Sequence, residues 1–219
     1  MVELNAIQQR VLGSLIEKDI TTPEYYPLSL NATVNASNQK SSRDPVMELS
    51  EADVRTALYE LDDQGLVRTL SDARVPKFEH RVRDVLQLRR DEVAVVCLLL
   101  LRGPQTSAEL RSRSERLYSF DDNAAVLATL ERLASREEPL TIMMARQPGS
   151  RESRWAHLLG GAVDSGVAPA EPSGIVRTGL TERVEQLEEL VRSLEARVKT
   201  LEGMETPGNN PGVDEPDLV

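Results

Sequence analysis

The sequence predicts a mainly α-helical protein with small β-hairpins, an α+β fold in which one set of elements occurs twice before a C-terminal helix. Three observations support this prediction. Hydrophobic residues make up 40% of the chain and aromatic residues only 3%, so the cores must be built from aliphatic side chains, which favours helices over a β-sandwich. Two stretches carry the same succession of helix and strand patterns. A heptad pattern near the C-terminus predicts a coiled coil.

The first set of elements begins at the N-terminus. Apolar residues recur at helical spacing over Leu4–Ile16 and predict a first helix. A second, shorter helix is expected within Leu28–Gln39. Ser50, with Asp53 three residues later, forms a capping-box pattern that begins a third helix, and Gly65 is a natural stop.

A hairpin is expected to follow these helices. Leu66–Leu70 and Lys77–Val82 are predicted strands on either side of the turn-prone segment Ser71–Pro76. Three helices and a hairpin in this order describe a winged helix. The sequence therefore predicts a first winged-helix domain over residues 1–85.

The same succession is then repeated. Val93–Leu101 predicts a helix, and Thr106 with Glu109 forms a second capping-box pattern. Leu140–Arg146 and Arg154–Leu159 are predicted strands. Residues 86–160 are therefore expected to form a second winged-helix domain.

Matched core positions strengthen the prediction of a duplicated fold. Asp121 or Asp122 is expected to cap the third helix of the second set. Both third helices carry apolar residues at a spacing of four and then three: Val54, Leu58 and Leu61 in the first, and Val126, Leu130 and Leu133 in the second. The closing strands share a tetrad, Lys77-Phe78-Glu79-His80 against Arg154-Trp155-Ala156-His157.

The helix predicted over Val93–Leu101 is apolar on nearly every side and ends in four leucines. A helix of this kind is usually buried on more than one face. We expect it to pack in its own core and also against the first domain or a partner chain, which would make the two domains a rigid pair.

The C-terminal part is expected to be a linker over residues 161–179, a coiled coil over 180–202 and a disordered acidic tail over 203–219. Valine at the a positions and leucine at the d positions favour a parallel two-stranded coil, hence a homodimer. The dimerisation residues are Leu180, Val184, Leu187, Val191, Leu194, Val198 and Leu201. The alternative is an amphipathic helix that folds back on the chain's own globular part.

Charge and composition limit the classes of function. The net charge is −10, and most of it lies in residues 161–219, so the globular part is nearly neutral. The single cysteine, Cys97, lies in an apolar run and predicts a buried, inert thiol. No secretory signal, membrane span, phosphate-binding loop or metal motif is present, so we expect a cytoplasmic protein that is not an enzyme and has no cofactor, metal or evident small-molecule substrate. His80 and His157 are expected to pack in strands.

Winged helices commonly bind duplex DNA through the third helix, but both third helices are predicted to be acidic here. The basic residues lie on the hairpins and on the loops instead. The candidate nucleic-acid contacts are Gln39, Lys40, Arg43, Arg68, Arg74, Lys77, Arg111, Arg113, Arg151 and Arg154. The alternative for the basic residues is that they are only solvated. The amides and hydroxyls of residues 31–43 could contact nucleic acid or serve as caps and turn formers, and the structural role is favoured.

Several long motifs resemble the YceH family of bacterial proteins. They are Arg10-Val11-Leu12-Gly13-Ser14-Leu15-Ile16-Glu17-Lys18, Thr21-Thr22-Pro23-Glu24, Asn38-Gln39-Lys40 with Arg43-Asp44-Pro45-Val46-Met47, and Leu99-Leu100-Leu101-Arg102-Gly103. The resemblance covers roughly residues 4–159 and implies tandem winged-helix domains. It implies no reaction or ligand. Ser37 departs from the pattern, since relatives often carry cysteine there.

Two hypotheses for function follow. The first is a dimeric regulator that contacts double-stranded DNA through its wings and loops, and it depends on fold analogy and on the hairpin arginines. The second is an adaptor that binds a partner protein through the acidic third helices and the apolar helix.

Overall fold

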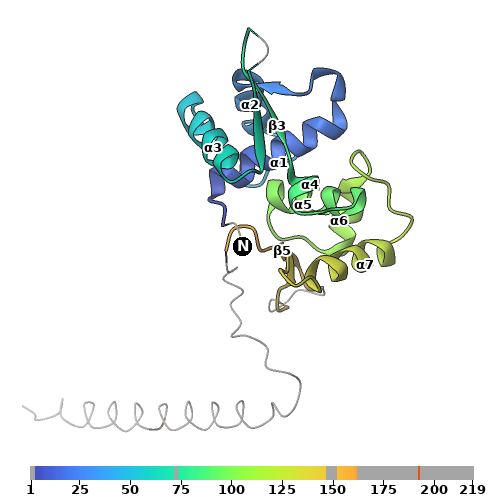
Figure 1. Cartoon of the computed structure of the whole chain (residues 1–219). Coiled ribbons are helices and arrows are strands. Elements are labelled where there is room, and N and C mark those ends of the chain that lie inside the picture. Colours follow the sequence, from blue (N-terminus) through green and yellow to red (C-terminus); the bar gives the residue numbers. More distant parts are fainter. Residues whose placement is uncertain (1–2, 72–73, 147–151, 162–191, 193–219) are drawn as a thin grey trace, which may run out of the picture. The chain divides into compact units, whose positions relative to one another are not determined.

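Two successive sets of helices and strands make up the folded part of the chain (Figure 1). The computed structural model describes residues 3–71, 74–146, 152–161 and 192. The predicted coiled coil and acidic tail, and nearly all of the predicted linker, lie outside these residues, as does Arg151. What the structure describes is an α+β protein with two small antiparallel sheets.

The first half (residues 3–85) combines helices with a three-stranded sheet of strand order β1-β3-β2. Phe78 lies in the central strand, opposite Leu28 on one side and Thr69 on the other. The elements in chain order are α1 (Ala6–Thr21), η1 (Pro23–Tyr25), β1 (Leu28–Ser29), α2 (Leu30–Ser37), α3 (Glu51–Asp63), β2 (Val67–Leu70), β3 (Lys77–His80) and α4 (Val82–Val85).

The described part of the second half (residues 86–161) repeats this order except for η1 and α4. Gln105 pairs with Trp155 in an isolated bridge, on the strand whose other neighbour is β4. Gln105 thus takes the place that β1 holds in the first half. The elements are α5 (Arg90–Arg102), α6 (Ser107–Ser114), α7 (Asn123–Ala134), β4 (Thr141–Met143) and β5 (Trp155–His157).

Equivalent backbone hydrogen bonds relate the two halves. Leu66 N donates to Leu61 O at 2.9 Å, and Leu140 N donates to Leu133 O at 3.0 Å. Each of these hairpins closes in the same way, because Leu66 O accepts from Arg81 N and Leu140 O accepts from Leu158 N.

The matching histidines also occupy equivalent positions. His80 pairs with Val67, the first residue of β2, and His157 pairs with Thr141, the first residue of β4. The alignment of the two tetrads is therefore confirmed by the strand register.

The predicted core positions on the third helices are confirmed. Val54, Leu58 and Leu61 on α3 and Val126, Leu130 and Leu133 on α7 are fully buried. The predicted helix starts are confirmed as well. Ser50 and Asp53 exchange both capping-box bonds, as do Thr106 and Glu109, while Asp122 accepts from Ala125 N at 2.8 Å.

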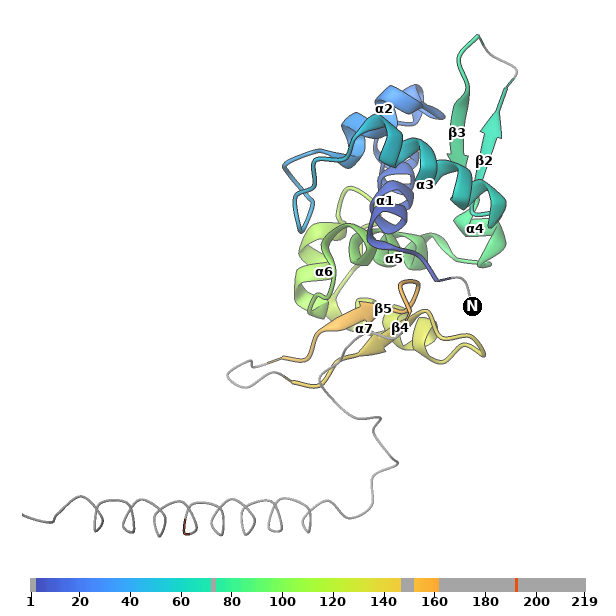
Figure 2. The same cartoon turned by 90° about the vertical axis from the view of Figure 1, so that its left-hand side faces the viewer.

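Helix α5 joins the halves. Every residue from Glu92 to Leu101 is buried, which confirms the expectation from its apolar sequence. Gly13 on α1 faces it so closely that a Cβ there would lie 2.9 Å from Leu101 Cδ2 and 3.2 Å from Leu100 Cβ. Cys97 is also buried against this contact, with Sγ 3.4 Å from Gly13 O. The halves therefore pack around one hydrophobic core and form one compact unit (Figure 2).

Some predicted boundaries were wrong. Leu28 and Ser29 form a strand, because they pair with β3, and α2 begins only at Leu30, after the Ser29 cap. The strand expected over Lys77–Val82 ends at His80, and Val82 instead begins the short helix α4. In the second hairpin, the strands of the described residues are shorter than predicted and span Thr141–Met143 and Trp155–His157.

Candidate nucleic-acid interface

The candidate contacts fall into separate places in the fold. Gln39, Lys40 and Arg43 belong to the loop after α2. Arg68, Arg74 and Lys77 belong to the first hairpin. Arg111 and Arg113 lie on α6, and Arg154, directly before β5, pairs with Glu109 on α6. In both cartoon views strands β2 and β3 extend upwards, away from α6 and α7 (Figures 1 and 2).

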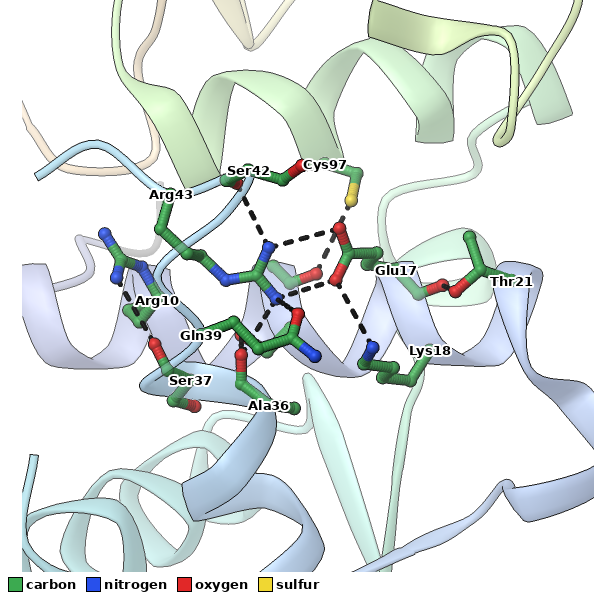
Figure 3. Close-up of polar contacts among 12 residues, drawn as sticks. Arg10, Glu17, Lys18, Thr21, Ala36, Ser37, Gln39, Ser42, Arg43 and Cys97 are labelled. Atoms are coloured by element: carbon green, nitrogen blue, oxygen red, sulfur yellow. Dashed lines mark hydrogen bonds and ion pairs between the residues drawn. The ribbon is translucent and has the colours of Figure 1, made fainter. Parts of the chain in front are cut away.

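Arg43 is not an exposed contact, which corrects its place among the candidates. Its side chain is fully buried and forms a two-point ion pair with Glu17 on α1. The Nη2 atom also donates to Ala36 O at 2.9 Å and to Gln39 Oε1 at 3.2 Å (Figure 3). A guanidinium with these partners cannot reach a phosphate, and its role is to hold the loop on α1.

The amides around Arg43 also have structural roles. Asn38 exchanges two hydrogen bonds with the backbone of Leu49, each 2.8 Å long, and so fastens the two ends of the loop together. Arg10, which is 2% exposed, donates to Ser37 O and to Pro45 O. The favoured interpretation of this polar stretch, as caps and turn formers, agrees with these bonds. Lys40, in contrast, is exposed.

The first hairpin is basic but partly neutralised. Arg68 pairs with Glu79 across the strands, with 2.6 Å between Nη2 and Oε1. Arg74 is exposed near the tip, and Lys77 is half-buried in β3. Arg68 and Arg74 are therefore the exposed cations of the three, and Arg68 is paired with Glu79.

Helix α3 presents an acidic outer face, as predicted. The exposed acids Glu51, Asp53, Glu60 and Asp63 lie there, and the one basic residue, Arg55, is bound to Glu51. Tyr59 is 57% exposed on the same helix. Bringing this surface to a phosphate backbone would be electrostatically unfavourable.

Helix α7 differs from α3, which corrects the expectation that both third helices are acidic. Its charged residues are only Glu131 and Arg132, and Arg132 is engaged with Asp91 and Glu92 at the start of α5. The acids counted from the sequence lie beyond the helix: Asp121 precedes it, Asp122 is its cap, and Glu137 and Glu138 follow its end. The exposed face of α7 consists of Asn123, Ala124, Ala128 and Glu131.

Next to this face, α6 supplies positive charge. Arg111 is exposed and donates to Asp121 O at 2.8 Å, which places it at the start of α7. Arg154 on the second hairpin donates to Pro104 O and pairs with Glu109 on α6 at 3.1 Å. A groove of about 420 Å³ lies between α6 and the start of α7; its lining residues are Ala108, Arg111, Ser112, Glu115, Ser119, Phe120 and Asn123.

The two histidines pack in strands. His80 Nε2 lies 3.3 Å from Asp19, and its backbone N donates to the Tyr26 hydroxyl at 2.6 Å. Burial lowers the pKa of His157 to about 4. Within the described ranges, no three His, Cys, Asp or Glu side chains gather as a metal site, and no helix there could cross a bilayer. Burial raises the pKa of the Cys97 thiol well above its usual range, so the thiol is unreactive.

These features define the class of protein: an α+β chain in which two sets of elements, with equivalent hairpins and third helices, share one core. Comparison with known sequences identifies the family of the chain. A family model described as "Protein of unknown function, DUF480" matches residues 4–150. The chain therefore belongs to this family, and the relatives it matches carry the name UPF0502.

Three relatives illustrate the similarity. A UPF0502 protein of Koribacter versatilis is 54% identical over 193 residues, 87% of this chain and 90% of the relative. UPF0502 protein YceH of Escherichia fergusonii is 48% identical over 206 residues, 91% and 96% of the two chains. A UPF0502 protein of Aeromonas hydrophila is 47% identical over 205 residues, 90% and 94% of the two chains. The resemblance to the YceH family is confirmed.

Proposed function

We propose that this chain is a tandem winged-helix protein that binds double-stranded nucleic acid through its second half. The order of helices and strands in each half, with a hairpin after the third helix, supports the assignment of winged helices. Equivalent hydrogen bonds in the two halves support a tandem pair. The chain then acts by binding and not by catalysis, with residues 1–85 and 86–160 as its two domains.

The contrast between the two third helices supports the choice of the second half. Helix α7 offers small and neutral side chains, Ala124 and Ala128 among them, where α3 offers carboxylates. A helix with small exposed residues can approach a groove closely. Arg111 and Arg154 lie around α6, where each can donate to a phosphate oxygen while α7 lies in the groove. The exposed face of α7 is the observation that carries this proposal.

Salt-dependent duplex binding tests the proposal. Affinity of the full chain for a labelled duplex, followed by fluorescence anisotropy, falls as salt rises, because phosphate contacts release counterions. Arg111→Gln weakens binding and lowers the slope of log affinity against log salt by about one phosphate contact. Arg55→Gln, which removes the same charge from α3, is the control and leaves both quantities unchanged. Absence of duplex binding at low salt would refute the function.

A protein partner is the second candidate function, and α3 favours it. Tyr59, 57% exposed among carboxylates, is a residue type enriched in protein interfaces. If the chain binds a protein, we expect that protein to copurify with it after nuclease treatment. Tyr59→Ala then abolishes the copurification, and no salt-dependent affinity for duplexes is found.

We also propose that the chain is a parallel homodimer, with the heptads from Leu180 to Leu201 as its coiled coil. Valine at a and leucine at d support two strands. The coil assists dimerisation, since about three heptads are marginal by themselves. A dimer carries two copies of the α6–α7 surface, which suits a site with two half-sites.

A further inference from the structure

A second cavity lies where the two halves meet, and it shares no lining residue with the groove between α6 and α7. Its volume is about 190 Å³, and we call it the junction pocket. Helix α1, the loop after α2, the end of α5 and α6 with the segment after it all contribute to its walls. The lining residues are Glu17, Lys18, Thr21, Gln39, Ser41, Ser42, Leu98, Arg102, Arg113, Arg116 and Leu117.

The charge of this lining is strongly unbalanced. Lys18, Arg102, Arg113 and Arg116 are cationic, and Glu17 is the one carboxylate among the lining residues. Both oxygens of Glu17 already accept from the buried Arg43 guanidinium, at 3.1 and 2.6 Å. Glu17 also lies 4.0 Å from Lys18 Nζ, and Arg113 pairs with Glu109 at 3.5 Å. Among the described residues, Arg102 and Arg116 are the two pocket cations that form no ion pair with a carboxylate.

Arg102 is the cation in the pocket whose surroundings are least favourable. Its Nε atom is buried and has no hydrogen-bonding partner among the described residues. Burial lowers the pKa of Arg102, and the guanidiniums of Arg113 and Arg43 lower it further, while Glu17 and Asp44 act in the opposite direction. A buried donor without an acceptor is unfavourable, so an anion in the pocket would relieve both the missing hydrogen bond and the repulsion.

The other polar groups suit an oxygen-rich anion. Arg113 is held in place by a 2.7 Å hydrogen bond to Gln105, so this cation is already positioned. Ser41 and Ser42, in the loop after α2, also line the pocket. Ser42 has a φ of 60°, a backbone conformation that is uncommon outside glycine and is often found at ligand sites.

The size and charge of the pocket indicate the ligand class. At about 190 Å³ it is smaller than the roughly 300–1,000 Å³ pockets that hold drug-sized molecules. Several guanidiniums in one small pocket match a group with more than one negative charge and several acceptor oxygens. We propose that the junction pocket binds a phosphoryl group, either free phosphate or the terminal phosphate of a monoester.

Because both halves supply lining residues, the ligand stabilises the way they pack together. It binds the folded chain and not the unfolded one, so it raises the melting temperature. This site is separate from the α6–α7 groove and does not depend on the proposed binding of duplexes.

Thermal unfolding and calorimetric titration of the full chain test the inference. Inorganic phosphate raises Tm saturably at constant ionic strength, whereas chloride does not. Arg102→Gln removes this response, and Arg116→Gln, which changes an exposed side chain, weakens the phosphate affinity by about tenfold, as expected for losing roughly 1.4 kcal/mol. Arg74→Gln on the first hairpin is the charge-matched control and keeps the full response.

Two oligonucleotides distinguish the sources of the phosphoryl group. One is a single strand with a 5′-phosphate, and the other is the same strand with a 5′-hydroxyl. If only the phosphorylated strand competes with inorganic phosphate, the ligand is a nucleic-acid end. If neither oligonucleotide competes and inorganic phosphate still binds, the ligand is a small free anion. The inference is overturned if phosphate does not change Tm, or if Arg102→Gln and Arg116→Gln both respond as the unaltered chain does. Duplex binding is measured separately, so either proposal can fail alone.

Discussion

Glu17 on α1 and Arg43 in the loop after α2 form a two-point ion pair, with 2.6 Å between Oε2 and Nη2. The Arg43 side chain is fully buried, and that of Glu17 is 15% exposed. The following residue, Asp44, donates its backbone N–H to Leu101 O on α5 at 2.9 Å. The pair therefore fixes a loop that links α1, α2 and α5.

Breaking this pair on one side should destabilise the protein strongly. Glu17→Gln leaves the Arg43 charge buried with only neutral acceptors, and we expect a loss of about 3–5 kcal/mol in the free energy of unfolding. Glu17→Gln combined with Arg43→Met should cost less than Glu17→Gln alone, because the buried charge of Arg43 is removed together with its partner. Urea unfolding of the variants measures both values. A loss below about 0.5 kcal/mol for Glu17→Gln, the range of ordinary surface changes, would contradict the assigned role.

The contact at Gly13 gives a graded prediction. A methyl group there approaches Leu101 to 2.9 Å, so Gly13→Ala requires α1 and α5 to shift slightly, and Gly13→Val requires more. Overpacking of a dense core costs about 1–3 kcal/mol, and we expect Gly13→Val to lie at the upper end. Thermal unfolding should rank the unaltered chain, the alanine variant and the valine variant in that order. An equally stable valine variant would mean that the halves do not pack this closely.

Acid should destabilise the protein through His157. Burial lowers its pKa from 6.5 to about 4, so the unfolded chain binds a proton more readily than the folded chain between these values. Stability is therefore lost as pH falls from 6.5 towards 4, by up to roughly 3 kcal/mol for a fully shielded group and by less for His157, which is partly exposed. Urea unfolding between pH 7 and 4 follows the loss. His157→Gln should reduce the dependence on pH, and an unchanged dependence would refute its origin in His157.

The heptads predict how the chain assembles. Val191→Asp places a carboxylate at an a position in the middle of the proposed coil, where burial of a charge against valine and leucine is unfavourable. We expect weaker self-association in analytical ultracentrifugation. Glu189→Gln, a change at an f position in the neighbouring heptad, should leave association unchanged. If the Val191→Asp variant dimerised with unaltered affinity, the alternative in which this helix contacts the chain's own globular part would be favoured.

Helix starts and core spacing were predictable because they depend on local patterns. Ser50, Thr106 and Asp122 cap the helices expected of them, and the matched residues of α3 and α7 are buried. The ends of the elements were harder to predict. The strand at Leu28, for example, forms only because Leu28 pairs with Phe78, which is distant in the sequence. The ion pairs could not be predicted either, because their two residues can lie far apart in the sequence. Arg43 is neutralised by Glu17, 26 positions earlier, and nothing local reveals this.

The site was only partly predictable for the same reason. The acids near α7 were counted as part of its surface, but the helix runs from Asn123 to Ala134 and leaves nearly all of them outside. Lys18 and Arg102 were missed, because each lies in a motif that resembles ordinary helix sequence. Only the fold brings them to one pocket with Arg113 and Arg116.

We propose that α7, the third helix of the second half, contacts nucleic acid and that α3, its equivalent in the first half, does not. Ala52 and Ala124 stand at equivalent places on α3 and α7, each two residues before the first core valine, and both are exposed. Duplex affinity at low salt, measured by fluorescence anisotropy, is compared for Ala52→Glu and Ala124→Glu. We predict that Ala124→Glu weakens binding by about tenfold or more, roughly 1.4 kcal/mol, while Ala52→Glu does not. Equal effects of the two substitutions, or a larger one at Ala52, would contradict the claim.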